Sequence, residues 1–419
     1  MVPEQTLRTL FDTAVAAANP TVCLPAYLPE PPKGRTLVVG AGKASSVMAQ
    51  SIELHWSGAL SGLVITRYDY GLPCEHIDVV EAAHPIPDQI GLNAALRIMK
   101  LVSTLEPNDL CIALMSGGAS SLLTLPAEGL TLADKQEVNR ALLRSGATIS
   151  DMNCLRKHLS AVKGGRLAAQ VAPARLVTLL ISDVPGDNPG VIGSGPTVPD
   201  QTTFKDALRI VKKYNIELPH SVARHLERGE PETPKPGDPI FEGSEVHLIA
   251  RPAVSLEAAA KKAREVGLNV LLLSDSLEGE AHEVAKDHAK LALAIRDGSG
   301  PVAPPALIIS GGELTVKILG NGRGGPNGEY MLAMAIALNG ADGLHAIACD
   351  TDGIDGSEDN AGARISPSTL RRGAKAGVNP HSHLVDNDSY SFFNALNDLI
   401  ITGPTYTNVN DFRAILVLS

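Results

Sequence analysis

Apolar and polar positions along the chain follow two alternating patterns. Short runs rich in β-branched residues predict strands, and longer stretches with apolar residues at helical spacing predict helices. In the first half these patterns predict strands at Thr36–Val39, Leu63–Thr66, Ile77–Ala82, Leu110–Met115 and Leu176–Ile181, and helices at Ala44–His55, Ile90–Leu105, Leu132–Gly146 and Asp151–Leu159. Such alternation is typical of βαβ units and predicts an α/β fold with mainly parallel sheets.

The second half repeats the alternation after a break. It predicts strands at Val246–Ala250, Val270–Ser274, Leu307–Ser310, His345–Cys349 and Ala414–Leu418, and helices at Ala253–Val266 and His282–Arg296. The segment Arg228–Gly243 is dense in proline, glycine and charge and has no periodicity, which predicts a linker. Because 419 residues exceed what one hydrophobic core usually supports, we expect two domains, at residues 1–235 and 244–419.

Composition narrows the class of protein. The net charge of −10 disfavours a nucleic-acid or membrane-surface role, so an anionic substrate would need locally placed cations. The five cysteines are scattered and form no CxxC pair, which indicates a reduced, cytoplasmic protein without a zinc cluster. No signal peptide and no apolar run of membrane-spanning length is found. These features predict a soluble cytoplasmic enzyme.

The sequence LVVGAGKASSVMA predicts a buried strand, a glycine turn and a helix. Gly40 and Gly42 would let a phosphate or carboxylate approach the backbone, where N–H groups and the helix dipole favour an anion. Lys43 stands at the helix start, where a cation is unfavourable unless an anion lies beside it. A surface lysine on a helix cap is the alternative. Ser45 replaces the third glycine of a dinucleotide fingerprint, and Arg67 stands where an acidic residue would hold a ribose.

A second strand, turn and helix follow at LMSGGASSLL. Ser116, Gly117, Gly118 and Ser120 could hold phosphate oxygens through backbone and hydroxyl donors. The alternative is a tight turn with a serine cap.

A concentrated basic segment comes next in NCLRKHLSAVKGGRLA. Arg156 and Lys163 belong to this segment, which could neutralise a polyphosphate. A solvated helix face is the alternative.

Two aspartates, Asp183 and Asp187, follow the strand predicted at Leu176–Ile181. Ligands of α/β proteins bind at the carboxyl ends of parallel strands. Both carboxylates are therefore candidates to hold Mg²⁺ or to orient a hydroxyl group.

The second half carries its own glycine turn, Ser310, Gly311 and Gly312, followed by Glu313. Arg323 lies in the glycine-rich stretch GNGRGG, which we interpret as a mobile loop that closes over a substrate. A surface loop is the alternative.

An aspartate-rich segment, CDTDGIDGSEDNAGA, resembles a calcium loop only at first sight. Asp355 stands where the loop needs glycine, and Ala361 where it needs glutamate. Asp352 is therefore interpreted as part of a Mg²⁺-nucleotide site, with a plain aspartate-rich turn as the alternative.

Taken in order, these motifs resemble the glycerate 2-kinase (MOFRL) family from Lys43 to the C-terminus. The matching segments are GAGKA, AAHPIPD, SGGASSLL, RKHLSAVKGGRLA, SDVPGDNPGVIGSGPTVPD, SGGELTV, GRGGPNGE, TDGIDG and GPTYTNVNDFRAILV. The resemblance implies an N-terminal Rossmann-like domain, a smaller C-terminal α/β domain of the MOFRL type, and an active site in the cleft between them. It implies transfer of the ATP γ-phosphate to the 2-hydroxyl of D-glycerate with Mg²⁺, with Lys43 and Arg323 as the principal residues.

The chain departs from the family pattern at Pro326 and Gly328, where arginine and glutamine are common, and at Arg251, where asparagine is common. These changes bear on substrate preference or rate more than on the reaction class. Two rival functions stay open: an NAD(P)H-dependent hydroxypyruvate reductase, and a non-catalytic protein that binds nucleotides or sugar acids. The oligomeric state is open too, with a homodimer among the alternatives.

Overall fold

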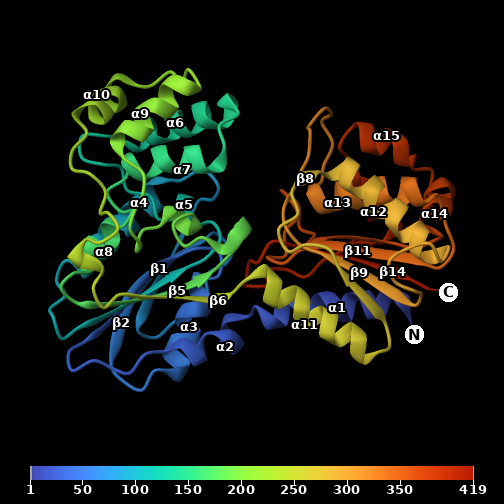
Figure 1. Cartoon of the computed structure of the whole chain (residues 1–419), viewed down its shortest axis with the longest axis horizontal. Coiled ribbons are helices and arrows are strands. Elements are labelled where there is room, and N and C mark those ends of the chain that lie inside the picture. The colour runs from blue at the N-terminus through green and yellow to red at the C-terminus, as the bar shows by residue number, and fades with distance from the viewer. Residues whose placement is uncertain (1, 419) are drawn as a thin grey trace. The chain divides into compact units, whose positions relative to one another are not determined.

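The computed structural model describes residues 2–418, which form two compact units (Figure 1). Pro20–Ile249 makes up the N-terminal unit. The C-terminal unit joins the segment up to Asn19 with the chain from Ala250 onward. The boundaries expected at residues 235 and 244 therefore differ from this division, and the first helix lies in the unit opposite to the one expected. Among the described residues, no helix has both the length and the apolar character of a membrane span.

A six-stranded sheet organises the N-terminal unit. Its strands are β1 (Thr36–Ala41), β2 (Leu60–Arg67), β3 (Ile77–Ala82), β4 (Leu110–Met115), β5 (Arg175–Ile181) and β6 (Glu245–Ala250). Their order is β3-β2-β1-β4-β5-β6, and the pairs from β3 to β5 are parallel. This order is that of a Rossmann-like sheet, so the expected fold of this half is confirmed. Strand β6 was expected to open the second domain but joins this sheet instead.

Helices cover both faces of this sheet. The helices on the two faces are α2 (Pro20–Cys23), α3 (Ser45–His55), α4 (Gln89–Val102), α5 (Ala119–Leu122) and α8 (Arg166–Val171). Side chains of α4, α5 and α8 share one core with β1, β2, β4 and β5. Helix α3 lies on the opposite face (Figure 1). The central strands β1, β4 and β5 are therefore buried on both sides, which explains their almost uninterrupted apolar sequences.

Four further helices form a separate layer with its own core (Figure 1). They are α6 (Leu132–Ser145), α7 (Ile149–His158), α9 (Phe204–Lys213) and α10 (His220–Arg228). Helices α6 and α9 both start with a capping box, made by Thr131 with Asp134 and by Thr203 with Asp206. Short 3₁₀ turns lie at Pro25–Tyr27, Pro185–Asp187, Ile192–Ser194 and Pro239–Phe241.

The sheet of the C-terminal unit is mainly antiparallel, contrary to expectation. Its strands are β7 (Asn269–Leu272), β9 (Ala306–Ser310), β11 (Leu344–Asp350), β12 (Gly362–Ile365), β13 (Leu399–Ile400) and β14 (Asp411–Val417). Their order is β13-β12-β11-β14-β9-β7, and within the described sheet only β7 and β9 pair in parallel. Two short strands, β8 (Gly279–Glu280) and β10 (Leu314–Thr315), pair with each other.

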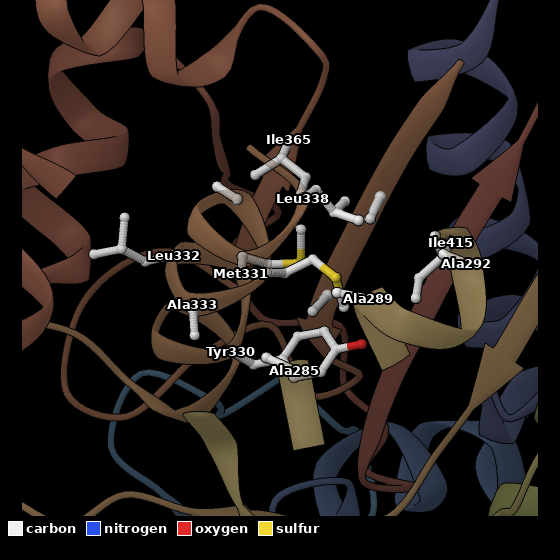
Figure 2. Close-up of a cluster of buried hydrophobic side chains, with 14 of the residues drawn as sticks. Ala285, Ala289, Ala292, Tyr330, Met331, Leu332, Ala333, Leu338, Ile365 and Ile415 are labelled. Atoms are coloured by element: carbon white, nitrogen blue, oxygen red, sulfur yellow. The ribbon is translucent and has the colours of Figure 1, made fainter. Parts of the chain in front are cut away.

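Alternating side chains of this sheet enter two cores. On one face, α1 (Pro3–Ala17) and α11 (Pro252–Glu265) pack against Leu307 and Ile309. On the other face, Ile308 packs with α12 (Ala281–Arg296) and α13 (Pro326–Leu338), and Figure 2 shows part of this core around Tyr330 and Met331. Helices α14 (Thr369–Ala376), α15 (Pro380–Val385) and α16 (Ser389–Leu396) complete this layer.

Candidate functional site

Two glycine turns meet at the centre of the N-terminal sheet. Strands β1 and β4 are neighbours, and the strand order reverses between them. Ligands of open α/β sheets bind outside the carboxyl ends of the strands at such a reversal. The turn after β1 holds Gly42 and Lys43, and the turn after β4 holds Ser116, Gly117 and Gly118. The sequence placed both turns among the candidate residues, and the topology brings them together.

Hydrogen bonds from backbone N–H groups link the two turns. The Lys43 N–H donates to the Gly117 carbonyl at 2.8 Å, and the Ala44 N–H donates to the Ser116 hydroxyl at 3.1 Å. A Cβ on Gly42, whose φ is +136°, would overlap the Ser116 side chain. Ser116 therefore accepts a hydrogen bond at the start of α3, whereas the helix after its own turn, α5, has Gly118 at its N-cap and no side-chain cap of the kind that the alternative interpretation expected.

Lys43, His84 and Gly118 lie close together beside this junction. Gly118 adopts a left-handed conformation with φ of +83°, and a Cβ there would lie 3.0 Å from the His84 ring and 3.5 Å from the Lys43 side chain. Lys43 is half-buried and precedes α3, whose positive end favours an anion. His84 belongs to the AAHPIPD segment of the family resemblance, but the sequence analysis assigned it no role in the site.

Gly40 has a different role from the one expected. It lies within β1, and a Cβ at this position would overlap the Leu114 carbonyl of β4. Glycine is needed here because the two strands approach closely.

The dinucleotide interpretation finds no support in the local structure. The Ser45 hydroxyl donates to the Ile65 carbonyl at 2.8 Å, and β2 ends at Arg67, where an acidic residue would bind a ribose.

A pocket of about 290 Å³ opens next to the second turn. Gly118, Ser120, Arg156 and Lys163, four of the predicted residues, line this pocket together with Lys135 of α6. The described residues that line it include no aspartate or glutamate. The pocket therefore gathers three basic side chains without a carboxylate, and an anionic ligand would favour their protonated forms.

Two of these cations are held in place by neutral oxygens. The Lys163 ammonium is buried and donates to the Ser120 and Leu123 carbonyls at 2.7 and 3.0 Å. Arg156 donates to the Asn139 side chain at 2.7 Å. Burial lowers the pKa of both groups, and for Lys163 the charges of Lys135 and Arg156 lower it further.

Lys135 is the pocket residue that the sequence analysis missed. Its Nζ is shielded from solvent and has no hydrogen-bond partner among the described residues. Burial, followed by repulsion from Arg156, lowers the pKa of Lys135 to about 7. A buried amine without a partner is rare in proteins, because the lost hydration is not replaced.

The rest of the predicted basic segment serves the fold. Lys157 forms an ion pair with the buried Asp200 at 3.2 Å. Arg166 donates to the Pro231 carbonyl at 2.8 Å, and His158 lies 3.0 Å from Glu232. Only part of this segment is therefore available to a ligand in the pocket.

Asp183 and Asp187 follow β5 at the same edge of the sheet as the two turns. Both are half-buried, and Asp187 has a left-handed backbone with φ of +53°. No group of three or more metal-ligating side chains occurs in the described part of the chain. Mg²⁺ is commonly held by only one or two carboxylates plus substrate phosphates, so these oxygens suit such an ion.

In the C-terminal unit, oxygens of the Ser310–Gly312 turn accept hydrogen bonds from a side chain of the same unit. Arg413 donates to the Gly311 carbonyl, to the Gly312 carbonyl at 3.1 Å and to the Ser310 hydroxyl at 3.3 Å. The same guanidinium pairs with Asp411 at 2.8 Å. Phosphate binding by this turn stays a prediction.

Asp411 belongs to a buried network at the start of α13. The Asn327 side chain donates to Asp411 at 2.6 Å, and the Asn327 and Gly328 N–H groups donate to Asp355 at 2.9 and 2.7 Å. Burial raises the pKa of Asp355 to about 7, and the nearby Asp411 charge adds to this shift. Asp355 therefore caps α13.

The other predicted residues of the C-terminal unit lie apart from this network. Asp352 is buried and accepts from the Ile354 N–H at 2.8 Å, as in an aspartate turn, whereas Glu313 is exposed. Arg323 pairs with Glu358 and lies 4.4 Å from the Tyr390 ring centre. Ligand contacts of all three stay predictions.

The glycines around Arg323 have a structural reason that the sequence did not reveal. Cβ atoms on Gly320 and Gly322 would overlap Asp386 and Asp388. The Arg323 N–H also donates to Asp388 at 3.1 Å. Close packing accounts for these glycines in this structure, and closure of the loop over a substrate stays a prediction.

Comparison with known proteins identifies relatives along the whole chain. Residues 6–227 match a domain of unknown function, DUF4147, and residues 306–411 match the MOFRL family. A protein of Agrobacterium vitis, provisionally named hydroxypyruvate reductase, is 53% identical over 416 residues, which cover 99% of this chain and 94% of that protein. D-glycerate 2-kinase of Thermotoga maritima is 40% identical over 400 residues, or 95% of this chain and 94% of that protein.

Solved structures agree with these relatives. The crystal structure of glycerate kinase from Thermotoga maritima matches with a TM-score of 0.89 at 38% identity, and the match covers 99% of each chain. Together with the motif order and the Rossmann-like sheet, these matches show that the chain belongs to the glycerate 2-kinase (MOFRL) family.

Proposed function

We propose that this protein is an ATP-dependent glycerate 2-kinase, which transfers the γ-phosphate of ATP to the 2-hydroxyl of D-glycerate and produces 2-phosphoglycerate and ADP. One observation carries the proposal. The Lys43 turn and the Ser116–Gly118 turn meet at the strand-order reversal, beside a pocket lined by three cations and, among its described residues, no carboxylate. Relatives named glycerate kinase support the same reaction class.

Phosphoryl transfer depends on positioning and positive charge rather than on covalent chemistry. We assign Lys43 to the transferring phosphoryl group or the substrate carboxylate, because it stands at the positive end of α3. The Gly117 and Gly118 turn would bind phosphate oxygens beside it. Asp183 and Asp187 are assigned to the metal or to the substrate hydroxyl. Mg²⁺, when bound, neutralises phosphate charge.

Arg323 keeps the role that the family resemblance implies, at the phosphoryl group or the substrate carboxylate. Its guanidinium can form the paired hydrogen bonds that such anions accept. In this structure Arg323 forms an ion pair with Glu358. A bound anion would take the place of the Glu358 carboxylate as the partner of Arg323.

A coupled assay tests the proposal. The protein is given ATP, Mg²⁺ and D-glycerate, ADP release is followed, and phosphorus NMR resolves the position of the new phosphate. We expect 2-phosphoglycerate. A 3-phosphoglycerate product would contradict the proposed position, and binding of ATP without turnover would favour a non-catalytic role.

Hydroxypyruvate reduction is the second candidate, favoured by the name of the Agrobacterium vitis relative. It requires a nicotinamide site, and the local structure at Ser45 and Arg67 does not supply the ribose contact of such a site. We therefore expect no loss of NADH or NADPH absorbance with hydroxypyruvate alone. Steady oxidation of either cofactor would favour the reductase.

A further inference from the structure

The pocket beside the Ser116–Gly118 turn contains a lysine whose position the fold alone does not explain. The Lys135 Nζ is shielded from solvent and has no hydrogen-bond partner among the described residues. Keeping an ammonium there destabilises the folded protein, because its lost hydration is not replaced. Side chains retained at such a cost commonly serve a ligand that supplies the missing partner.

The charges around Lys135 define the chemistry of that ligand. Arg156 of α7 and Lys163 of the following loop line the same pocket, as does His84. The hydrogen bonds of Arg156 and Lys163 go to amide and carbonyl oxygens, and the described lining residues include no carboxylate that could neutralise them. A single carboxylate would leave most of this positive charge unbalanced, whereas a polyphosphate carries several negative charges.

The size and the walls of the pocket support the same ligand. At about 290 Å³ the pocket lies near the lower end of the range for small-molecule sites, about 300 to 1,000 Å³. Pro85, Pro87 and Leu143 add an apolar wall to the lining. A three-carbon hydroxy acid would leave that wall uncovered, but a ribose or base attached to phosphates could cover it.

We propose that this pocket binds the phosphate groups of the nucleotide, with Lys135 and Arg156 as the residues that contact them. The proposal rests on the proposed function for the identity of the nucleotide as ATP. It adds a phosphate site on α6 and α7, next to the turn whose Gly118 lies beside the Lys43 side chain.

Calorimetric titration of purified variants tests this assignment. The probes are ATP, inorganic phosphate and D-glycerate, each added to wild type, Lys135→Met and Arg156→Gln. Arg140→Met is the matched control, because Arg140 is an exposed cation on the same helix and its loss changes the net charge equally. Melting temperatures measured without ligand report whether each variant folds.

We expect Lys135→Met to weaken ATP and phosphate binding by roughly tenfold or more, as expected when one charge-assisted hydrogen bond is lost. Arg156→Gln should behave similarly, and Arg140→Met should leave both affinities within about twofold of wild type. D-glycerate affinity should not change. Without ligand, Lys135→Met should melt no lower than wild type, whereas a lysine needed for packing would lower the melting temperature.

Three results would overturn the assignment: unchanged ATP affinity in Lys135→Met, loss of D-glycerate affinity instead of ATP affinity, or a wild-type protein that binds neither ATP nor phosphate. The test also separates this proposal from the proposed function. If Lys135→Met weakens ATP binding but wild type does not phosphorylate glycerate, the pocket assignment stands and the reaction fails. If wild type makes 2-phosphoglycerate while Lys135→Met keeps normal ATP affinity, the reaction stands and the pocket assignment fails.

Discussion

Two turns with the same three residues, Ser116–Gly118 and Ser310–Gly312, have different surroundings in this protein. Both follow a buried strand, and both end in a left-handed glycine, with φ of +83° at Gly118 and +87° at Gly312. At the first turn, the last glycine faces the side chains of Lys43 and His84. At the second, it faces the backbone of Leu277. The same motif therefore borders a pocket in one unit and closed packing in the other.

Charge balance separates the two turns further. Arg413, the cation at the second turn, is buried and paired with Asp411 at 2.8 Å. Near the first turn, Arg156 and Lys163 have neutral oxygens as partners, and Lys135 has no hydrogen-bond partner among the described residues. A Ser-Gly-Gly motif thus defines a backbone shape, and the unbalanced charge around it indicates where an anion can bind.

Among the substitutions that test this comparison, Arg413→Met should have the largest effect, which is a loss of stability. The substitution leaves Asp411 buried without its cation, so we expect the free energy of unfolding to fall by about 3–5 kcal/mol. Urea denaturation measures this, with Arg371→Met, an exposed arginine of the same unit, as control. Normal stability of Arg413→Met would contradict a structural role for the second turn.

Lys43→Ala, at the first turn, should lower activity and leave stability nearly unchanged. We expect turnover with ATP and D-glycerate to fall about a hundredfold or more, since one preorganised charge contact is worth roughly 3 kcal/mol in the transition state. The melting temperature should stay near that of wild type. Steady-state kinetics decides, with the exposed Lys100→Ala on α4 as control. Turnover close to wild type would make Lys43 a surface lysine.

Paired glycine substitutions compare the two turns directly. An alanine in the left-handed region costs about 1–2 kcal/mol, and both positions carry this cost. Gly312→Ala should cost more than Gly118→Ala, because its Cβ would overlap the Leu277 backbone, whereas at Gly118 the nearest atom belongs to the His84 ring at 3.0 Å. Equal losses in thermal unfolding would show that the second turn is packed no more tightly than the first.

A further expected effect, similar in size to that of the glycine substitutions, is a pH dependence of stability that arises from Lys135. Its folded pKa of about 7 lies below the usual lysine value, so the unfolded chain binds more protons above pH 7. This group therefore makes the protein more stable as pH rises from about 7 toward 10, by up to about 1.4 kcal/mol per pH unit. In Lys135→Met that contribution should vanish. Urea denaturation at pH 7 and 8.5 compares the two proteins, and identical slopes would contradict a buried lysine.

The first sheet could be predicted from the sequence because its strands carry local signals. Thr36–Val39 and Leu110–Met115 are short apolar runs that each lead into a glycine-containing turn, and both are strands in the structure. The parallel pairing followed from the helices between them. In the second sheet, pairing between β14 and β9 joins segments about a hundred residues apart, and no local pattern shows that they run antiparallel.

Helix α13 was missed for a related reason. Its first residues, Pro326 to Gly328, suggest a loop, and the remainder is buried on all sides, so no amphipathic period is visible. Lys135 was missed because it lies on a helix with many polar residues, where lysine normally faces solvent. Only the three-dimensional structure, in which Lys135 lines the pocket beside the turn after β4, reveals the burial of its Nζ.

The position of α1 has a consequence for how the polypeptide acquires its structure during synthesis. This helix leaves the ribosome before the N-terminal unit does, yet Leu7 and Phe11 pack against α11 and β14, and the Ala14 carbonyl accepts from the Ser255 hydroxyl. The whole N-terminal unit is therefore translated before any of these partners exist. Until then α1 must stay unpaired, with its apolar stripe available to chaperones. Contacts between segments so far apart in the sequence form slowly during folding. The C-terminal unit should therefore be the last part of the nascent chain to become resistant to protease.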